Sequence, residues 1–584
     1  MQKGNGGPSF FGRLTTSKAV YVIIIIGIII YFNSLLNGFV LDDATQIVQS
    51  TNIHSIKNIV SFFQGSTFNY PVNNAHQLTG VYYKPVLLTF FSIIYTVFGA
   101  NAFYFHLLQL LLHIANTVMV FLFFSFFFKK QFSIFLSLIF LIHPINTESV
   151  VYISSLQDVL FFFFGMIALV TLAKTKVLQT YKQCIFYLLI FFLMLFSLLS
   201  KETGVIFIFV LPFFAFLFKK RNVKFIAITV GLSLVAYFIL RFFVGHVYFN
   251  ITGISNISEL PLSQRLISVP KILFYYIQTF FVPLNLFTAQ GWVVKDFTIQ
   301  DFYLPLTVDG IFCISLLGLG TFIWNKEKAF INTYLFFLMW FLVGLCFHLQ
   351  IIPLDQTVAD RWFYFSIVGL LGLSGLLIQL LLAKSRRIFI IATLIGFFII
   401  AIFSLRTLIR NIDWYTNYSL TSHDILFEEN SEFMQNALGL ELLKMGKYNE
   451  AENHFQLSYQ LSPQSAILSN LALAYGREGN FTKSEETYYK LIKVDKQYFL
   501  AYINLSYFQL KSNKPQIAEE TARQGLALFP DETKLWILLS FAQYKMGNYQ
   551  QAVESINKAY NLSPTDTKQI HDMIVNHLPI DSYL

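Results

Sequence analysis

The stretch AVYVIIIIGIIIYFNSLL, residues 19–36, is apolar over a length that can cross a lipid bilayer. Three basic residues precede it within the first 18 residues. The segment Asn33 to Gly38 lacks the small-residue pattern of a signal-peptide cleavage site. We therefore expect an uncleaved first membrane span, with residues 1–18 in the cytoplasm.

The composition extends this prediction to most of the chain. Of the 584 residues, 55% are hydrophobic and only 12% are charged, about half the charged fraction of soluble domains. The mean hydropathy is +0.58, and the 67 phenylalanines suit lipid-facing helices. Three cysteines all lie in apolar runs, which indicates neither a disulfide framework nor a zinc site: Cys184, Cys313 and Cys346.

Ten further apolar runs follow the first one. Basic residues such as Lys129, Lys174, Lys219, Lys326 and Arg387 mark alternate connections, and the positive-inside rule puts these connections in the cytoplasm. The runs are 103–128, 131–143, 149–173, 183–200, 203–218, 223–245, 305–323, 329–351, 362–382 and 388–408.

Two shorter apolar stretches, 84–99 and 268–288, complicate the count of spans. If only one of them crossed the membrane, later basic connections would face outward. Both are therefore expected to lie on the outer face, or both to span, giving eleven or thirteen spans. The predicted fold is an all-α helix bundle over residues 19–408, with a first outer loop at 37–102 and a linker at 409–430 on the outer side.

This topology gathers the unusual polar residues of the membrane part on the outer face. Charged residues near membrane depth are costly, and they usually line a cavity or a functional site. They come from four separate outward turns: Asp42 and Asp43; His143, Glu148 and Asp158; Lys201 and Glu202; Asp360 and Arg361.

These residue types can support sugar or phosphate chemistry. Asp42 and Asp43 can act as a general base, or can bind Mg²⁺ or Mn²⁺, which prefer carboxylate oxygens. Arg361 and Lys201 can hold a phosphate, the arginine through its two-pronged guanidinium group. A base for an acceptor and a cradle for a leaving phosphate are what glycosyl transfer from a lipid phosphate requires.

Structural interpretations remain open for the same residues. The Asp42–Asp43 pair can be a solvated loop, His143 can simply end a helix, and Lys201 with Glu202 can form a local salt bridge. His106 and His113 lie on one face of an apolar helix, where packing is at least as good an explanation as ligand binding. From these patterns alone, a transferase, a transporter of lipid-linked sugars and a membrane-anchored scaffold all remain candidates.

The last 150 residues have a different composition and an internal repeat. Gly446, Gly479, Asn513 and Gly547 begin similar tripeptides 33 to 34 residues apart, each followed by a small residue five positions later. This period is typical of tetratricopeptide repeats. We predict four repeats and a capping helix over 431–578, which bind a protein partner or serve as a spacer. The excess basic charge lies between the apolar runs, so it does not indicate nucleic-acid binding.

The ordered motifs resemble a known family. In sequence they are Phe39-Val-Leu-Asp-Asp43, Tyr83-Lys-Pro85, Phe105-His106 with His113, His143-Pro-Ile-Asn-Thr-Glu148, Asp158, Lys201-Glu202-Thr-Gly204 and Asp360-Arg361-Trp-Phe-Tyr364. Together with the repeats, this series is similar to the transmembrane and tetratricopeptide-repeat-containing O-mannosyltransferases, which are GT-C glycosyltransferases.

The resemblance implies a polyprenyl-phosphate donor carrying a hexose such as mannose, and a site on the outer face. It implies Asp43 as the base supported by Asp42, and Arg361, Lys201 and Asp360 as donor contacts. Protein Ser/Thr hydroxyls, presented by the repeats, are the implied acceptors, and the chain's character suggests a prokaryotic plasma membrane. Three positions depart from the family pattern: Gln109, Gln157 and Ala359.

Overall fold

The computed structural model describes residues 15–67, 82–175, 180–219, 223–248, 257–288, 290–382 and 386–580. They form two compact units, Met1–His423 and Asp424–Leu584. The described residues form helices and contain no named strand, only an isolated antiparallel bridge between Gln290 and Val358. The predicted all-α class is confirmed. Residues 1–14 of the predicted N-terminal segment and 68–81 of the predicted outer loop lie outside the described residues.

Nine helices in the described ranges are long and apolar enough to cross a membrane. They show that the chain is an integral membrane protein. In order they are α1 (Thr16–Tyr31, extended by η1, Phe32–Leu36), α4 (Ala102–Phe127), α7 (Leu156–Lys174), α8 (Thr180–Ser200), α10 (Val223–Ile239, extended by η10, Leu240–Val244), α13 (Leu304–Lys326), α14 (Ile331–Cys346), α15 (Phe363–Leu382) and α16 (Arg386–Asp413).

The other two predicted spans are also helical. Helix α5 (Lys130–Ile142) and the segment Pro144–Val151 form a tenth candidate span that bends by 50°. The bend falls where Pro144 cannot donate a backbone hydrogen bond. Helix α9 (Ile206–Phe218) follows the 3₁₀ turn η8 (Glu202–Val205) and forms a shorter apolar helix with it.

The two ambiguous stretches form short helices, α3 (Pro85–Phe98) and α12 (Val269–Phe281). They have 14 and 13 residues, which corresponds to a length of about 20 Å, against the roughly 30 Å of a bilayer core. Their lengths therefore favour the arrangement on or dipping into one face over two additional spans. The other short elements before α13 are η2 (Ala44–Val48), η3 (Thr51–His54), η4 (Ile56–Asn58), α2 (Ile59–Phe62), η6 (Pro144–Asn146), α6 (Thr147–Val151), η7 (Ile153–Ser155), α11 (Leu262–Ile267) and η11 (Ile299–Tyr303).

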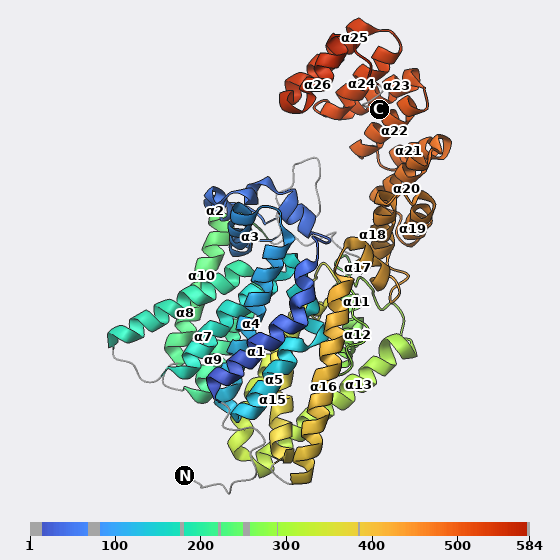
Figure 1. Cartoon of the computed structure of the whole chain (residues 1–584). Coiled ribbons are helices and arrows are strands. Elements are labelled where there is room, and N and C mark those ends of the chain that lie inside the picture. The colour runs from blue at the N-terminus through green and yellow to red at the C-terminus, as the bar shows by residue number, and fades with distance from the viewer. Residues whose placement is uncertain are drawn as a thin grey trace. The chain divides into compact units, whose positions relative to one another are not determined.

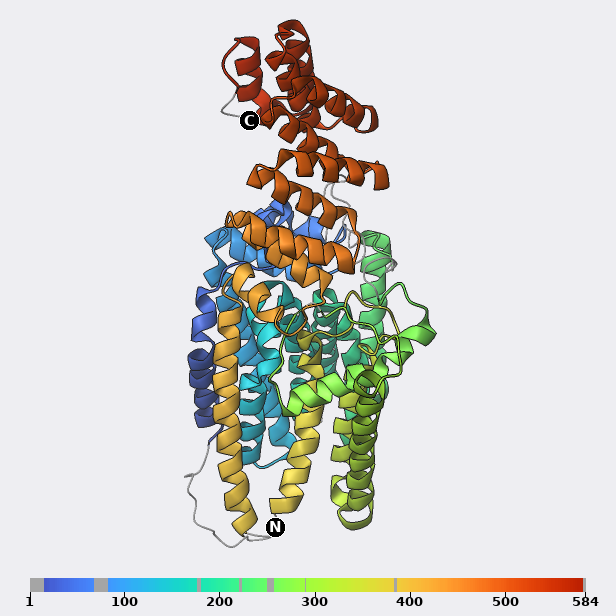
Figure 2. The same ribbon diagram turned by 90° about the vertical axis from the view of Figure 1, so that its right-hand side faces the viewer.

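The described basic connections and the acidic turns lie at opposite ends of the bundle. Lys219, after α9, donates to the carbonyl of Thr175 at 3.1 Å, so the last turns of α7 and α9 meet. Asp158 lies at the other end of α7, in its first turn. Figures 1 and 2 show α1 beside α16 in the same bundle, and Asn411 of α16 donates to the carbonyl of Ile30. Lys220, Arg221 and Lys384, from the same connections, lie outside the described residues.

The second unit consists of helical hairpins in chain order. Three turns between paired helices place glycine in a left-handed conformation, with φ of 76°, 94° and 80° at Gly446, Gly479 and Gly547. Asn513 takes the same conformation with φ 57°, which asparagine tolerates better than most residues. The helices are α18 (Glu432–Lys444), α19 (Tyr448–Leu461), α20 (Ser465–Glu478), α21 (Phe481–Val494), α22 (Phe499–Lys511), α23 (Pro515–Leu528), α24 (Thr533–Lys545), α25 (Tyr549–Leu562) and α26 (Pro564–Val575).

The small residue of each repeat is fully buried. Ala451, Ser484, Ala518 and Ala552 each have 0% exposure, at the packing position that the sequence pattern assigns to them. Each lies in the second helix of its pair. The hairpins bury their apolar faces against their neighbours, as expected of a tetratricopeptide solenoid.

Candidate active site

Asp43 is fully buried and holds two parts of the first unit together. One oxygen of its carboxylate accepts from the backbone N–H and the hydroxyl of Ser154, at 2.8 and 2.6 Å. The other accepts from the N–H of Val40 at 3.1 Å. Burial raises the pKa of Asp43 to about 7, although its hydrogen bonds with Ser154 and Val40 act in the opposite direction. Asp43 therefore ties the loop after α1 to the turn before α7.

Asp42, the residue immediately before Asp43, is exposed, whereas Asp43 is buried. The backbone N–H of Asp42 donates to the hydroxyl of Tyr152 at 3.4 Å, and Tyr152 stacks on Trp414 at the end of α16. The preceding residue, Leu41, has a positive φ of 50°. Asp42 is thus the carboxylate of the pair that a substrate can reach.

Glu148 and Arg361 form a buried ion pair between two outward turns. The Arg361 guanidinium bonds one carboxylate oxygen of Glu148, and the backbone N–H of Arg361 donates to the other at 3.0 Å. The side chains are only 3% and 11% exposed. Glu148 lies in α6 (Thr147–Val151) and Arg361 in η13 (Asp360–Trp362). Breaking such a pair would leave a buried charge unpaired, so it fixes the start of α15 against α6.

Lys201 pairs with Asp158, not with Glu202. Its ammonium group lies 2.5 Å from one carboxylate oxygen of Asp158. The other oxygen of Asp158 is buried without a hydrogen-bond partner in the part of the chain described. Glu202 instead accepts from Arg241 at 3.0 Å and from the N–H of Tyr83 at 3.1 Å. The interpretation of Lys201 and Glu202 as a local salt bridge is therefore wrong.

Asp360 contacts a different element. It is 3% exposed and accepts a short hydrogen bond from the hydroxyl of Tyr275, which lies on α12. Gln290 donates to the same hydroxyl at 2.8 Å. Asp360 thus connects the start of α15 to the short helix α12. It lies next to Arg361 in the chain.

The three histidines have structural contacts. His143 accepts from the N–H of Ile145 at 3.2 Å and contacts the carbonyl of Phe280 at 3.0 Å, which ends α5 at an interface. His113 contacts the Tyr364 hydroxyl at 2.8 Å and the carbonyl of Leu141 at 3.0 Å. His106 is buried beside the backbone of residues 37–38. These contacts agree with the structural interpretation of the sequence, in which His143 ends a helix and His106 and His113 pack in the bundle.

No group of three or more metal-binding side chains occurs among the residues that the structure describes. At the Asp42–Asp43 pair, both oxygens of Asp43 already accept hydrogen bonds from the chain. Only Asp42 of this pair is an exposed residue, and its side chain also contacts Tyr152. One available carboxylate makes a poor match for the six oxygen ligands that Mg²⁺ prefers.

The predicted acids and bases nevertheless come together. Arg361 interacts electrostatically with Glu148, Asp355 and Asp158, and also with Tyr152. Tyr152 contacts Asp42, and Asp158 pairs with Lys201. The turns after α1 and before α7, α9 and α15 therefore contribute to one charged cluster.

Sequence reasoning did not single out several members of this cluster. Tyr152 and Ser154 carry no pattern that distinguishes them. Arg241 lies inside a predicted span, where a charged residue is a signal in itself. It is 1% exposed and bonds the Tyr237 hydroxyl at 2.8 Å as well as Glu202. Lys84 belongs to the quoted Tyr83-Lys-Pro85 motif, and it is 5% exposed.

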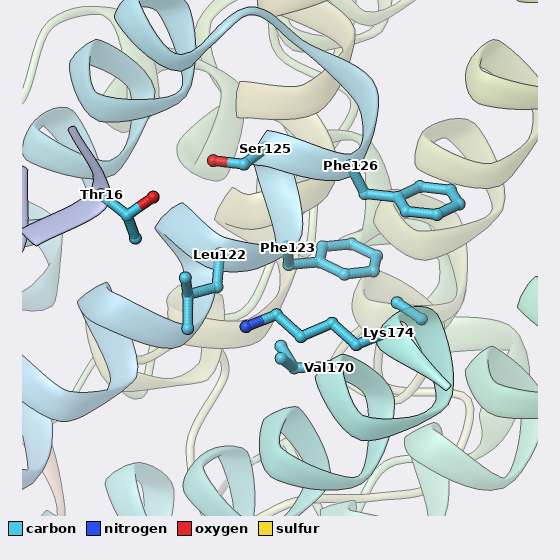
Figure 3. A pocket seen from close by; sticks show the side chains of 8 residues that line it. Thr16, Leu122, Phe123, Ser125, Phe126, Val170 and Lys174 are labelled. Carbon is cyan, nitrogen blue, oxygen red and sulfur yellow. The ribbon is translucent and has the colours of Figure 1, made fainter. Parts of the chain in front are cut away.

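Two cavities lie away from the charged cluster. Figure 3 shows one of about 280 Å³, which Thr16 at the start of α1, Ser125 near the end of α4 and Lys174 at the end of α7 border. The other, of about 510 Å³, is apolar, and α13 and α15 line most of it. The Lys174 cavity is at the end of α7 opposite Asp158, so it is not the site formed by the predicted residues.

Comparison with known proteins confirms the resemblance predicted from the motifs. Human protein O-mannosyl-transferase TMTC3 is 22% identical, over 93% of this chain and 68% of that protein. Protein O-mannosyl-transferase F38B6.6 of Caenorhabditis elegans is 23% identical, over 79% of this chain and 65% of that protein. The chain thus spans about two thirds of the length of these relatives.

The repeats also match known proteins. The tetratricopeptide-repeat family model matches residues 434–465, 466–498 and 533–566. A solved structure of MamA (residues 41 to the end) from Desulfovibrio magneticus RS-1 is 17% identical over 25% of this chain and 90% of that one, with a TM-score of 0.22. The family match confirms the predicted repeat type for three of the four helix pairs.

Proposed function

We propose that this protein is a membrane glycosyltransferase that moves a hexose such as mannose from a polyprenyl-phosphate donor to a hydroxyl of a protein acceptor. The observation that carries the proposal is the single cluster of acids and bases contributed by turns far apart in the chain. Relatives named as protein O-mannosyl-transferases support the reaction class. A scaffold that merely anchors the repeats has no need of buried ion pairs joined to an exposed acid.

Asp42 is the general base in this proposal. The residue is exposed and its side chain contacts Tyr152, whereas the carboxylate of Asp43 is buried and accepts hydrogen bonds from Ser154 and Val40. This reverses the roles that the family resemblance implied for the two residues. Asp43 becomes a positioning residue, because it fixes the loop on which Asp42 lies.

The reaction breaks the bond between the sugar's anomeric carbon and the phosphate oxygen, and that oxygen keeps the electron pair. The acceptor hydroxyl oxygen forms the new bond to the anomeric carbon, and its proton passes to Asp42. The products are a glycosylated acceptor and a polyprenyl phosphate. Arg361 and Lys201 face the donor phosphate, while their partners Glu148 and Asp158 hold them in place. Asp360 holds the turn that carries Arg361 against α12 through its hydrogen bond from Tyr275.

The site faces the outer side of the membrane in this proposal. The basic connections lie at the opposite end of the bundle, which the positive-inside rule assigns to the cytoplasm. The end of α16 lies at the same end as Asp42, since the N–H of Gly38 donates to the carbonyl of Tyr415 at 3.0 Å. Residues 414–431, between α16 and α18, include the short helix α17 (Asn417–Asp424) and the acidic residues Asp424, Glu428 and Glu429, so they do not form an apolar span that recrosses the bilayer.

The repeats supply the acceptor. On the same side of the membrane, they can hold a polypeptide and raise its effective concentration near the site, to the millimolar range for a short linker. An assay with purified protein, a labelled polyprenyl-phosphate hexose and a Ser/Thr-containing peptide tests the proposal. Label should pass to the peptide with equal release of polyprenyl phosphate. Separate donors carrying mannose, glucose and galactose identify the sugar.

A further inference from the structure

Lys84 is a buried cation with no ion-pair partner among the described residues. In the part of the chain that the structure describes, no carboxylate oxygen lies within 4.0 Å of its ammonium group, although the residue is only 5% exposed. The ammonium lies 3.9 Å from the centre of the Tyr82 ring, an attractive but weak contact. An ammonium carries three hydrogen-bond donors that an anionic ligand can accept. A mostly buried lysine with no ion pair among the described residues is therefore a candidate for binding a ligand.

The backbone around Lys84 is held firmly. The N–H of Tyr83 donates to Glu202 at 3.1 Å, and the hydroxyl of Tyr83 donates to the carbonyl of Phe63 at 2.9 Å. The N–H of Lys84 donates to the hydroxyl of Thr67 at 2.8 Å. Pro85 then begins α3. The Lys84 side chain therefore starts from a backbone position that is fixed by several hydrogen bonds.

The surrounding charges place Lys84 at the cluster described above. Glu202, Lys201, Asp355 and Asp158 all act on it electrostatically. Burial lowers the pKa of Lys84 to about 8, and Lys201 acts in the same direction while the three carboxylates oppose it. Lys84 is thus mostly protonated at pH 7. Lys201 and Arg361, by contrast, are already paired with Asp158 and Glu148.

We propose that Lys84 binds the phosphate of the lipid-linked donor and stabilises the charge that develops on that phosphate as the sugar leaves. This inference rests on the proposed function and names the cation that takes the leaving group. A phosphodiester carries one negative charge, whereas the released monoester carries between one and two at pH 7. Lys84 therefore stabilises the transition state and product more than the bound donor, and such an interaction raises kcat.

Lys84→Met and Lys84→Arg test this assignment, with Lys174→Met as a matched control at the opposite end of α7. Removing one preorganised donor to a developing charge costs about 10²- to 10³-fold in kcat. We expect that loss for Lys84→Met, activity within about tenfold of wild type for Lys84→Arg, and no change for the control. Wild-type kinetics from Lys84→Met would overturn the inference while leaving the proposed function intact.

The pH profile separates charge from packing. For the wild type, kcat/KM should fall as pH rises through about 8, because the neutral amine no longer attracts the phosphate. Lys84→Arg should stay level to about pH 10, since a guanidinium remains protonated there. An alkaline limb identical in both proteins would contradict the assignment.

A binding measurement makes the test independent of the sugar and of turnover. Geranylgeranyl phosphate should raise the Tm of the wild-type protein in detergent, and should not raise that of Lys84→Met. Inorganic phosphate and geranylgeraniol serve as separate probes of the two halves of the ligand. An equal rise for Lys84→Met with geranylgeranyl phosphate, or a rise with inorganic phosphate alone, would rule out a lipid-phosphate site at Lys84.

Discussion

Asp43 accepts hydrogen bonds from both the backbone N–H and the hydroxyl of Ser154, at 2.8 and 2.6 Å, although the two residues are 111 positions apart in the sequence. This contact joins the loop after the first span to the turn before α7 and leaves the adjacent Asp42 exposed. Two neighbouring acids therefore have different tasks. Asp43 positions the loop, and Asp42 is the proposed general base.

Asp43→Asn should destabilise the protein. Its amide would place N–H donors where one oxygen now accepts from Val40 or where the other accepts from Ser154, so at least one buried donor loses its partner. The expected cost is about 1–3 kcal/mol in the free energy of unfolding. A lowered Tm in detergent, measured by intrinsic fluorescence, checks this. Unchanged Tm together with complete loss of transfer would instead return the role of base to Asp43.

Asp43 should also make stability depend on pH. Its folded pKa of about 7 lies above the ordinary aspartate pKa of 3.8, so the folded state binds more protons between these values. Stability from this group is present below about pH 4 and is lost as pH rises through about 7. Asp42 and Tyr152, the nearest ionisable groups, are unchanged in Asp43→Asn. The Tm difference between wild type and variant should therefore vary over this range, and a constant difference would contradict it.

The Glu148–Arg361 pair should show strong coupling. Glu148→Met or Arg361→Met alone leaves a buried charge, at an expected cost of about 3–5 kcal/mol. The double variant Glu148→Met with Arg361→Met should be more stable than either single variant, because no charge remains unpaired. Tm values of the four proteins complete the cycle. Additive effects would mean that the two side chains do not depend on each other.

Chelation should leave transfer within about twofold of its starting rate. Asp43 is occupied by the chain, so Asp42 alone is a weak ligand for Mg²⁺ or Mn²⁺. The measurement is turnover after dialysis against EDTA, with Mn²⁺ restored in a parallel sample. A large loss that Mn²⁺ reverses would restore the metal interpretation of this pair.

The repeats should be accessible from outside the cell. Lys496, an exposed residue between α21 and α22, replaced by cysteine should react with a membrane-impermeant thiol reagent in intact cells. Lys328→Cys, at the basic end of the bundle, should react only after the membrane is broken. Both variants need Cys184, Cys313 and Cys346 replaced by serine. The opposite pattern would place the repeats in the cytoplasm and exclude them as presenters of an external acceptor.

The elements could be predicted because their signals are local. Apolar length determines the spans, and the left-handed turn positions with Ala451 and its equivalents determine the repeats. The pairing of the charges was not predictable. Lys201 forms an ion pair with Asp158, 43 residues earlier in the chain, whereas its neighbour Glu202 pairs with Arg241. The different exposure of Asp42 and Asp43 was not predictable either, because Asp43 is buried by its contact with Ser154, which lies 111 residues away in the chain.

The most direct test compares wild type, Asp42→Asn and Asp42→Glu in transfer of labelled mannose from a polyprenyl phosphate to a Ser/Thr peptide. Each purified protein is first matched for Tm, since Asp42 is exposed and its replacement should leave folding unchanged. Asp42→Asn should lower kcat by about 10²- to 10⁴-fold, the usual cost of losing a general base, and Asp42→Glu should retain part of the rate. Wild-type turnover by Asp42→Asn, or no label transfer by the wild-type protein from any polyprenyl-phosphate hexose, would contradict the account.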